Sequence, residues 1–129
     1  MVVLCDTSVL VPSFFKGHIH HSRTFPVFQK ITGGKVVGVV AQHSLAECFS
    51  SFTRIPNLPP VSPEQAREMI RKNILDTFRV VALDVEDYMA AVDCVSEKNL
   101  GGGAIYDALI LRAAIKGKVD RLLTWNRKH

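Results

Sequence analysis

Short apolar runs alternate with longer amphipathic stretches along most of the chain. The apolar runs are rich in Val, Ile and Leu and have the length of strands that are covered on both faces: residues 2–5, 36–41, 78–83 and 121–124. The stretches between them predict helices over residues 8–15, 20–31, 42–54, 62–75, 84–98 and 104–116. This alternation predicts an α/β fold, with a mostly parallel sheet and helices on both of its faces.

Capping and stop signals mark the predicted helices. Ser62 is suited to cap a helix whose first turn holds Pro63, and Gln65 completes a capping box. Asp84 is a similar cap for the next helix, and Gly117 is a stop signal after residue 116. No repeat or low-complexity stretch divides the chain, so we expect a single domain over residues 1–129.

Composition narrows the class of protein only moderately. The 129 residues are 47% hydrophobic and carry a net charge of +4, which permits an anionic partner without identifying one. No apolar stretch approaches the roughly 20 residues needed to cross a bilayer, and no leader opens the chain, so we expect no membrane contact and a cytoplasmic protein. Cys5, Cys48 and Cys94 form no CxxC pair, and we expect them to be buried thiols in a reducing compartment.

Four acidic or amide side chains follow strand-like runs or lie on predicted helices. They are Asp6, Glu47, Asp107 and Asn126, and the first and last lie at the carboxyl ends of two predicted strands. Ligands bind at that edge of open α/β sheets, and converging oxygen atoms suit a hard divalent cation. The pattern therefore favours a metal-dependent nuclease.

Each of the three carboxylates also has a simpler interpretation. Asp6 precedes Thr-Ser at a strand-to-helix junction, which is typical of an N-cap. Glu47 projects away from the apolar stripe of its helix, together with Ser51 and Arg54, as on a solvated face. Asp107 lies on a helix that is apolar nearly all round, so we expect it to be partly buried and to need a partner, either a cation or backbone amides.

Taken together, the four positions resemble the motifs of the PIN-domain ribonucleases, particularly the VapC-like toxins of toxin–antitoxin pairs. The matching segments, in family order over essentially the whole chain, are Asp6-Thr7-Ser8, Leu45-Ala46-Glu47, Tyr106-Asp107-Ala108-Leu109-Ile110 and Leu123-Thr124-Trp125-Asn126. The match departs from the family at Asn126, where many members carry Asp, and in ending at His129, where many members continue.

The resemblance implies a three-layer α/β/α domain with a central sheet of four or five strands. It implies an endoribonuclease with Mg²⁺ or Mn²⁺ bound by Asp6, Glu47 and Asp107, and with Asn126 as a weak or outer ligand. The implied partners are RNA as substrate, a small antitoxin protein and a second copy of the chain in a homodimer.

Neighbouring polar residues could support such a site. Thr7, Ser8 and Thr124 could orient ligands or bound water through their hydroxyls, or could simply make local capping hydrogen bonds. Basic residues near the motifs could contact phosphates or could form a solvated surface: Arg54, Arg112, Arg121, Arg127 and Lys128.

Histidine and aromatic residues leave further alternatives open. One cluster of histidines precedes the second predicted helix: His18, His20 and His21. These side chains could lie on the surface or cap the helix, or they could contact substrate. A zinc site is the remaining alternative, although it would need more ligands at suitable spacing. Trp125 could stack on a base but is more typical of a core. The phenylalanines of the first helical region are candidates for an antitoxin or dimer interface, or for the core: Phe14, Phe15, Phe25 and Phe28.

Two other functions fit the same residues less well. An α/β phosphohydrolase or response regulator could use Asp6 as a phosphoryl acceptor, but Thr7-Ser8 does not supply the second acidic group such sites need. A PIN-like module that binds RNA or protein without cleavage is the other alternative, and Asn126 is the only residue that points to it.

Overall fold

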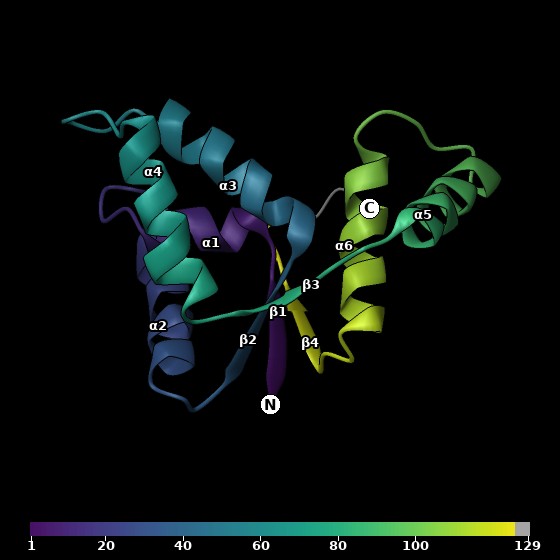
Figure 1. Ribbon diagram of the computed structural model, residues 1–129, viewed down its shortest axis with the longest axis horizontal. Helices are drawn as coiled ribbons and strands as arrows, with labels where there is room; N and C mark the ends of the chain where they lie inside the picture. Colours follow the sequence, from purple (N-terminus) through teal and green to yellow (C-terminus); the bar gives the residue numbers. More distant parts are fainter. Residues whose placement is uncertain (126–129) are drawn as a thin grey trace.

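The computed structural model describes residues 1–125 and has three layers (Figure 1). A parallel sheet separates helices α1 to α4 on one side from helices α5 and α6 on the other. The expected α/β/α class is confirmed, with four strands in the described part of the chain. No helix of residues 1–125 combines the length and apolarity that crossing a bilayer requires.

The sheet has the order β3-β2-β1-β4, and all three pairings are parallel. Its strands are β1 (Val2–Cys5), β2 (Val37–Ala41), β3 (Arg79–Val81) and β4 (Arg121–Leu123). The third strand is shorter than the predicted 78–83, because its pairing with β2 covers only residues 79–81. Phe78 and Leu83 lie beyond these ends and are buried, which explains why the apolar run is longer than the strand. The central position of β1 brings the chain after Cys5 between the ends of β2 and β4.

The helices follow the amphipathic stretches closely. They are α1 (Thr7–Ser13), α2 (His21–Thr32), α3 (Gln42–Arg54), α4 (Pro63–Met69), α5 (Val85–Glu97) and α6 (Ala104–Lys116). The predicted capping box forms at Ser62 with Gln65, and the predicted cap Asp84 also forms a capping box, with Asp87 as its second member. The predicted helix 62–75 changes after Met69 into the π-helix η1 (Ile70–Leu75), a change in hydrogen bonding that the apolar pattern does not signal.

Each face of the sheet has its own hydrophobic core. Phe52, Leu10 and Ile74 belong to the core under α1 to α4, and Leu4, Leu109 and Ala113 to the core under α5 and α6. Cys5 and Cys48 are buried as expected, and burial raises the pKa of each thiol to about 12. The expectation for Cys94 is wrong, because its position on α5 faces solvent.

Candidate active site

Asp6 ends the central strand and starts the first helix. Its backbone N–H donates to Leu123 O at 3.2 Å, which continues the pairing of β1 with β4. Its carboxylate accepts hydrogen bonds from the N–H of Ser8 at 3.0 Å and from the Ser8 hydroxyl. Asp6 is therefore an N-cap, and the cap also fixes its carboxylate at the carboxyl edge of the sheet.

Glu47 reaches the same edge from the adjacent strand. Helix α3 begins directly after β2, and Glu47 lies in its second turn with a half-buried side chain. Its Oε1 atom accepts a hydrogen bond from Thr7 Oγ1 at 3.4 Å. Burial raises the pKa of Glu47, the Thr7 hydrogen bond opposes this rise, and the charge of Asp6 adds to it.

Asp6 and Glu47 are linked through α1, because Thr7, the residue after Asp6, donates to Glu47 while Ser8 donates to Asp6. Two carboxylates that interact at one site repel each other, and a bound cation would remove that cost. The Glu47 side chain is 42% exposed and also bonded to α1, so it is neither freely solvated nor buried, and its role as a metal ligand stays a prediction.

Asp107 lies in the first turn of α6 and is half-buried, as expected from the apolar surroundings in the sequence. Within residues 1–125 no group of three His, Cys, Asp or Glu side chains is arranged to hold a metal ion. The structure thus brings Asp6 and Glu47 together and does not gather Asp107 with them into such a group. Asn126 lies outside the described residues.

Two carboxylates are sufficient for the kind of cation expected here. Mg²⁺ keeps several of its waters and uses one or two carboxylates together with phosphate oxygens of the substrate. Asp6 and Glu47 offer hard oxygen ligands whose mutual repulsion a cation would relieve, so the residues present fit Mg²⁺ or Mn²⁺.

Three hydroxyls join the two carboxylates to their surroundings. The Ser8 hydroxyl lies between Asp6 and the end of β4, where it accepts the Trp125 N–H at 2.9 Å and lies 3.4 Å from Thr124 Oγ1. Thr7 bonds to Glu47, as described above. Ser8 and Thr7 thus contact Asp6 and Glu47 directly, and Thr124 lies beside the Ser8 hydroxyl. The capping bond is made by Ser8, whose N–H donates to Asp6.

One residue beside Glu47 has no place in the family motifs. His43 lies one helical turn earlier on α3, with its Nε2 atom 3.6 Å from Glu47 Oε1. Its side chain is only 11% exposed, and neither ring nitrogen has a hydrogen-bond partner in the part of the chain described. Its spacing of four residues from Glu47 on a predicted helix was the available signal in the sequence.

The basic residues differ in what they contact. Arg54 is exposed at the end of α3 and lines a cavity of about 520 Å³ together with His18 and Ser51. Arg112 donates from Nε to Asp87 at 2.8 Å, although its side chain is still 41% exposed. Arg121 is exposed on β4, and Arg127 and Lys128 lie outside the described residues.

The histidine cluster lies against Trp125. The ring of His20 stacks on the indole at a centroid distance of 4.8 Å, and the guanidinium of Arg23 lies 5.6 Å from the indole centroid. Trp125 also packs against the core under α1 to α4, so its ring is already engaged by the protein itself. Burial and the two neighbouring histidines lower the pKa of His18.

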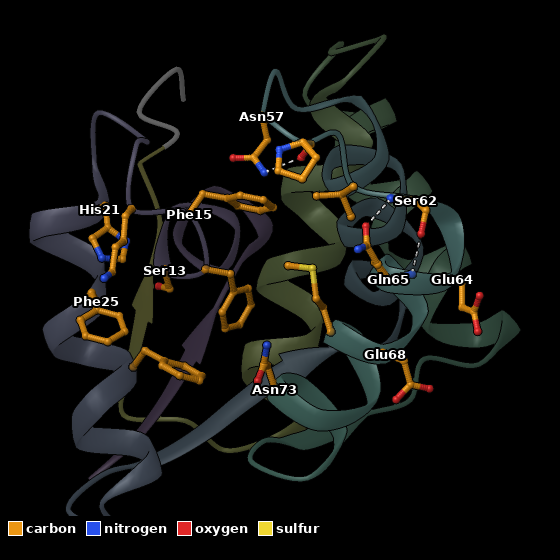
Figure 2. A pocket seen from close by; sticks show the side chains of 16 residues that line it. Ser13, Phe15, His21, Phe25, Asn57, Ser62, Glu64, Gln65, Glu68 and Asn73 are labelled. Carbon is orange, nitrogen blue, oxygen red and sulfur yellow. Dashed lines mark hydrogen bonds between the residues drawn. The ribbon is translucent and has the colours of Figure 1, made fainter.

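An apolar groove lies between α2 and α4 (Figure 2). Its volume is about 1040 Å³, and its apolar lining includes Phe14, Phe15, Phe25, Phe28 and Met69. The core role expected for these phenylalanines is confirmed in part, whereas an interface role stays a prediction. Phe15 is buried in the core, Phe14 and Phe28 pack against that core, and all four contribute surface to the groove.

A second apolar surface runs along α5. Val85 is three and four residues from Tyr88 and Met89, Val92 is four and three residues from the same pair, and each of the four is at least 40% exposed. At this spacing they form one stripe on the helix, which we call the α5 stripe.

Comparison with known proteins agrees with this geometry. Residues 3–129 match the model of the PIN domain family. The chain is 30% identical over 105 residues to the ribonuclease VapC40 of Mycobacterium tuberculosis, which covers 81% of this chain and 72% of that protein.

Solved structures share the fold at low sequence identity. The Sarcin–Ricin loop cleaving toxin VapC20 of Mycobacterium tuberculosis has a TM-score of 0.75 at 13% identity, over 96% of this chain and 89% of that one. A VapBC2 structure from Rickettsia felis, bound to a promoter DNA fragment, has a TM-score of 0.65 at 18% identity, over 99% and 90% of the two chains. The chain belongs to the PIN-domain family, in which its relatives are VapC ribonucleases.

Proposed function

We propose that this protein is an endoribonuclease that hydrolyses RNA phosphodiester bonds with a divalent cation, as the toxin of a toxin–antitoxin pair. The observation that carries the proposal is that hydrogen bonds from Ser8 and Thr7 hold Asp6 and Glu47 at the ends of the adjacent strands β1 and β2, at the carboxyl edge of the parallel sheet. The 30% identity to a VapC ribonuclease supports the same reaction.

Asp6, Glu47 and Asp107 are the proposed ligands of Mg²⁺ or Mn²⁺, with Asn126 as a weak or outer ligand. Such a cation supplies a water of lowered pKa and neutralises charge on the phosphate. The chain's own part is to hold the carboxylates in position. Ser8 and Thr7 do this by donating hydrogen bonds to Asp6 and Glu47.

The substrate RNA is proposed to extend from this edge along α3. Glu47, Ser51 and Arg54 share one face of the helix, and Arg54 lies about 10 Å from Glu47 at a rise of ~1.5 Å per residue. Arg54 therefore suits a phosphate beyond the scissile one, next to the cavity that it lines with His18. Arg112, Arg127 and Lys128 remain candidates for further phosphate contacts.

The experiment that tests this function is cleavage of a mixed RNA panel by purified protein with Mn²⁺ or Mg²⁺. We expect cutting that EDTA abolishes and that Asp107→Asn abolishes, whereas the matched variant Asp76→Asn, at an exposed position, keeps full activity. A folded protein that binds the metal but cuts no RNA of the panel would favour the non-cleaving PIN-like module.

The antitoxin is proposed to bind in the groove between α2 and α4. Its apolar lining is concave and about 1040 Å³ in volume, which suits the apolar side chains of a short peptide segment (Figure 2). We expect Phe25→Asp to prevent co-purification with a co-expressed antitoxin while RNA cleavage is retained. Antitoxin binding that survives this change would place the contact elsewhere.

The homodimer is proposed to form through the α5 stripe. A two-fold interface brings the same surface of both copies together, so one self-complementary apolar stripe is sufficient to start such a contact. Exposed apolar rows of this kind are unusual on a monomer surface.

A further inference from the structure

His43 is the buried polar side chain of α3 that the proposed reaction does not yet use. Its Nδ1 and Nε2 atoms are both inaccessible to solvent and have no hydrogen-bond partner among residues 1–125. Burying polar atoms without partners destabilises a fold. A leucine would fill similar space without that cost, so packing alone does not explain a histidine at this position.

Glu47 is the polar group closest to the ring in a suitable direction. The distance from His43 Nε2 to Glu47 Oε1 is 3.6 Å, slightly beyond a hydrogen bond. The two residues lie one turn apart on the same helix face, so a small side-chain rotation closes the gap. Thr7 approaches the same Oε1 atom at 3.4 Å from α1.

We propose that His43 is a positioning residue that donates a hydrogen bond from Nε2–H to Glu47 and holds its carboxylate toward Asp6. The inference rests on the function proposed above and deepens it by adding a residue outside the four motifs. The 3.6 Å approach of Nε2 to Glu47 Oε1, and the lack of any other partner for Nε2 among residues 1–125, carry this assignment.

His43 acts through Glu47 and does not touch RNA in this proposal. Both of its nitrogens are buried, so they cannot reach a phosphate or a base on the surface. A hydrogen-bond donor behind a metal-binding carboxylate fixes the orientation of that carboxylate, and loss of such a donor typically weakens metal binding about 10- to 100-fold.

The test compares His43→Leu and His43→Gln with wild type, and Ser44→Ala is the matched control. Ser44 is the next residue on α3, is buried and also has a hydroxyl without a partner in the described chain. Because the Ser44 hydroxyl has no hydrogen-bond partner among residues 1–125, Ser44→Ala removes a buried polar atom of α3 without breaking a hydrogen bond to Glu47. Mn²⁺ affinity is measured by calorimetry. The melting temperature is measured on the metal-free protein, and the orientation of Glu47 is followed through its carboxyl ¹³C resonance in the same metal-free state.

We expect His43→Leu to weaken Mn²⁺ binding by roughly 10-fold or more, to shift the Glu47 resonance, and to leave the melting temperature unchanged or higher. His43→Gln should restore part of the affinity because it keeps a donor, and Ser44→Ala should bind Mn²⁺ like wild type.

Two results would overturn the inference while leaving the proposed function intact. One is His43→Leu protein with wild-type Mn²⁺ affinity and an unshifted Glu47 resonance, beside a wild type that binds Mn²⁺ and cleaves RNA. The other is a large loss of thermal stability in both His43 variants, which would make the residue structural. A wild type that neither binds Mn²⁺ nor cleaves RNA would overturn both proposals.

Discussion

At the scale of single residues, Ser8 connects Asp6 to the segment that follows β4. Its hydroxyl donates to Asp6 and accepts the backbone N–H of Trp125, so one atom joins the end of β1 to the chain that follows β4. The N-cap role of Asp6 is therefore compatible with its proposed role as a metal ligand. The capping bonds that start α1 also hold its carboxylate at the sheet edge.

We expect Ser8→Ala to lower the free energy of unfolding by about 1–2 kcal/mol and to reduce RNA cleavage. The alanine leaves the Trp125 N–H without its acceptor and lets the Asp6 carboxylate turn away from Glu47. Urea denaturation and cleavage assays measure the two effects. Ser50→Ala, an exposed change on α3, is the control and should alter neither.

At the scale of elements, one buried carboxylate joins α5 to α6. Asp87 closes the capping box of α5 and also accepts Arg112 Nε at 2.8 Å and Lys116 Nζ at 2.6 Å. The hydrogen bond from Lys116, the contacts with Asp84 and the hydrogen bond from Arg112 hold the pKa of Asp87 well below its ordinary value of 3.8. Arg112 is consequently a structural partner of α5 as well as a candidate phosphate contact.

We expect Asp87→Asn to destabilise the protein at neutral pH and to have a smaller effect in acid. A depressed pKa means that the ionised carboxylate stabilises the fold above pH 3.8, and that this contribution is lost as the pH falls below that value. Urea unfolding of wild type and variant from neutral pH to about pH 3 measures the difference. The exposed Asp93→Asn should behave like wild type throughout, and an Asp87→Asn effect independent of pH would contradict the prediction.

At the scale of the whole molecule, the two faces of the sheet present different surfaces. The side with α1 to α4 contains the groove proposed for the antitoxin and the cavity beside Arg54. The α5 stripe lies on the opposite side of the sheet (Figure 1). This separation allows antitoxin binding and self-association to occur at the same time.

We expect wild type to elute as a dimer and Met89→Lys to elute as a monomer with an unchanged melting temperature. The lysine puts a charge in the middle of the α5 stripe, where a dimer would have to bury it. Light scattering after gel filtration measures the mass. Cys94→Lys adds the same charge at an exposed position of α5 outside the stripe and should leave the dimer intact.

The sequence predicted the local structure well because local rules decide it. Helices 42–54 and 104–116 have the predicted bounds, since their hydrophobic period and flanking signals depend on neighbouring residues alone. The π-helix after Met69 escaped prediction because the apolar period does not distinguish it from a regular helix. The family and the α/β class predicted from the motifs are confirmed, whereas the roles of the individual site residues remain predictions.

The sequence by itself determined the alternation of strands and helices. It also determined that Asp6 directly follows the first strand and that Glu47 lies in the helix after the second strand. Only the tertiary structure decided the strand order that places β1 beside β2, and with it the interaction of the two carboxylates. It also decided the burial of His43 and the ion pair of Arg112 with Asp87. These depend on packing between segments far apart in the chain, which hydrophobic periodicity does not encode.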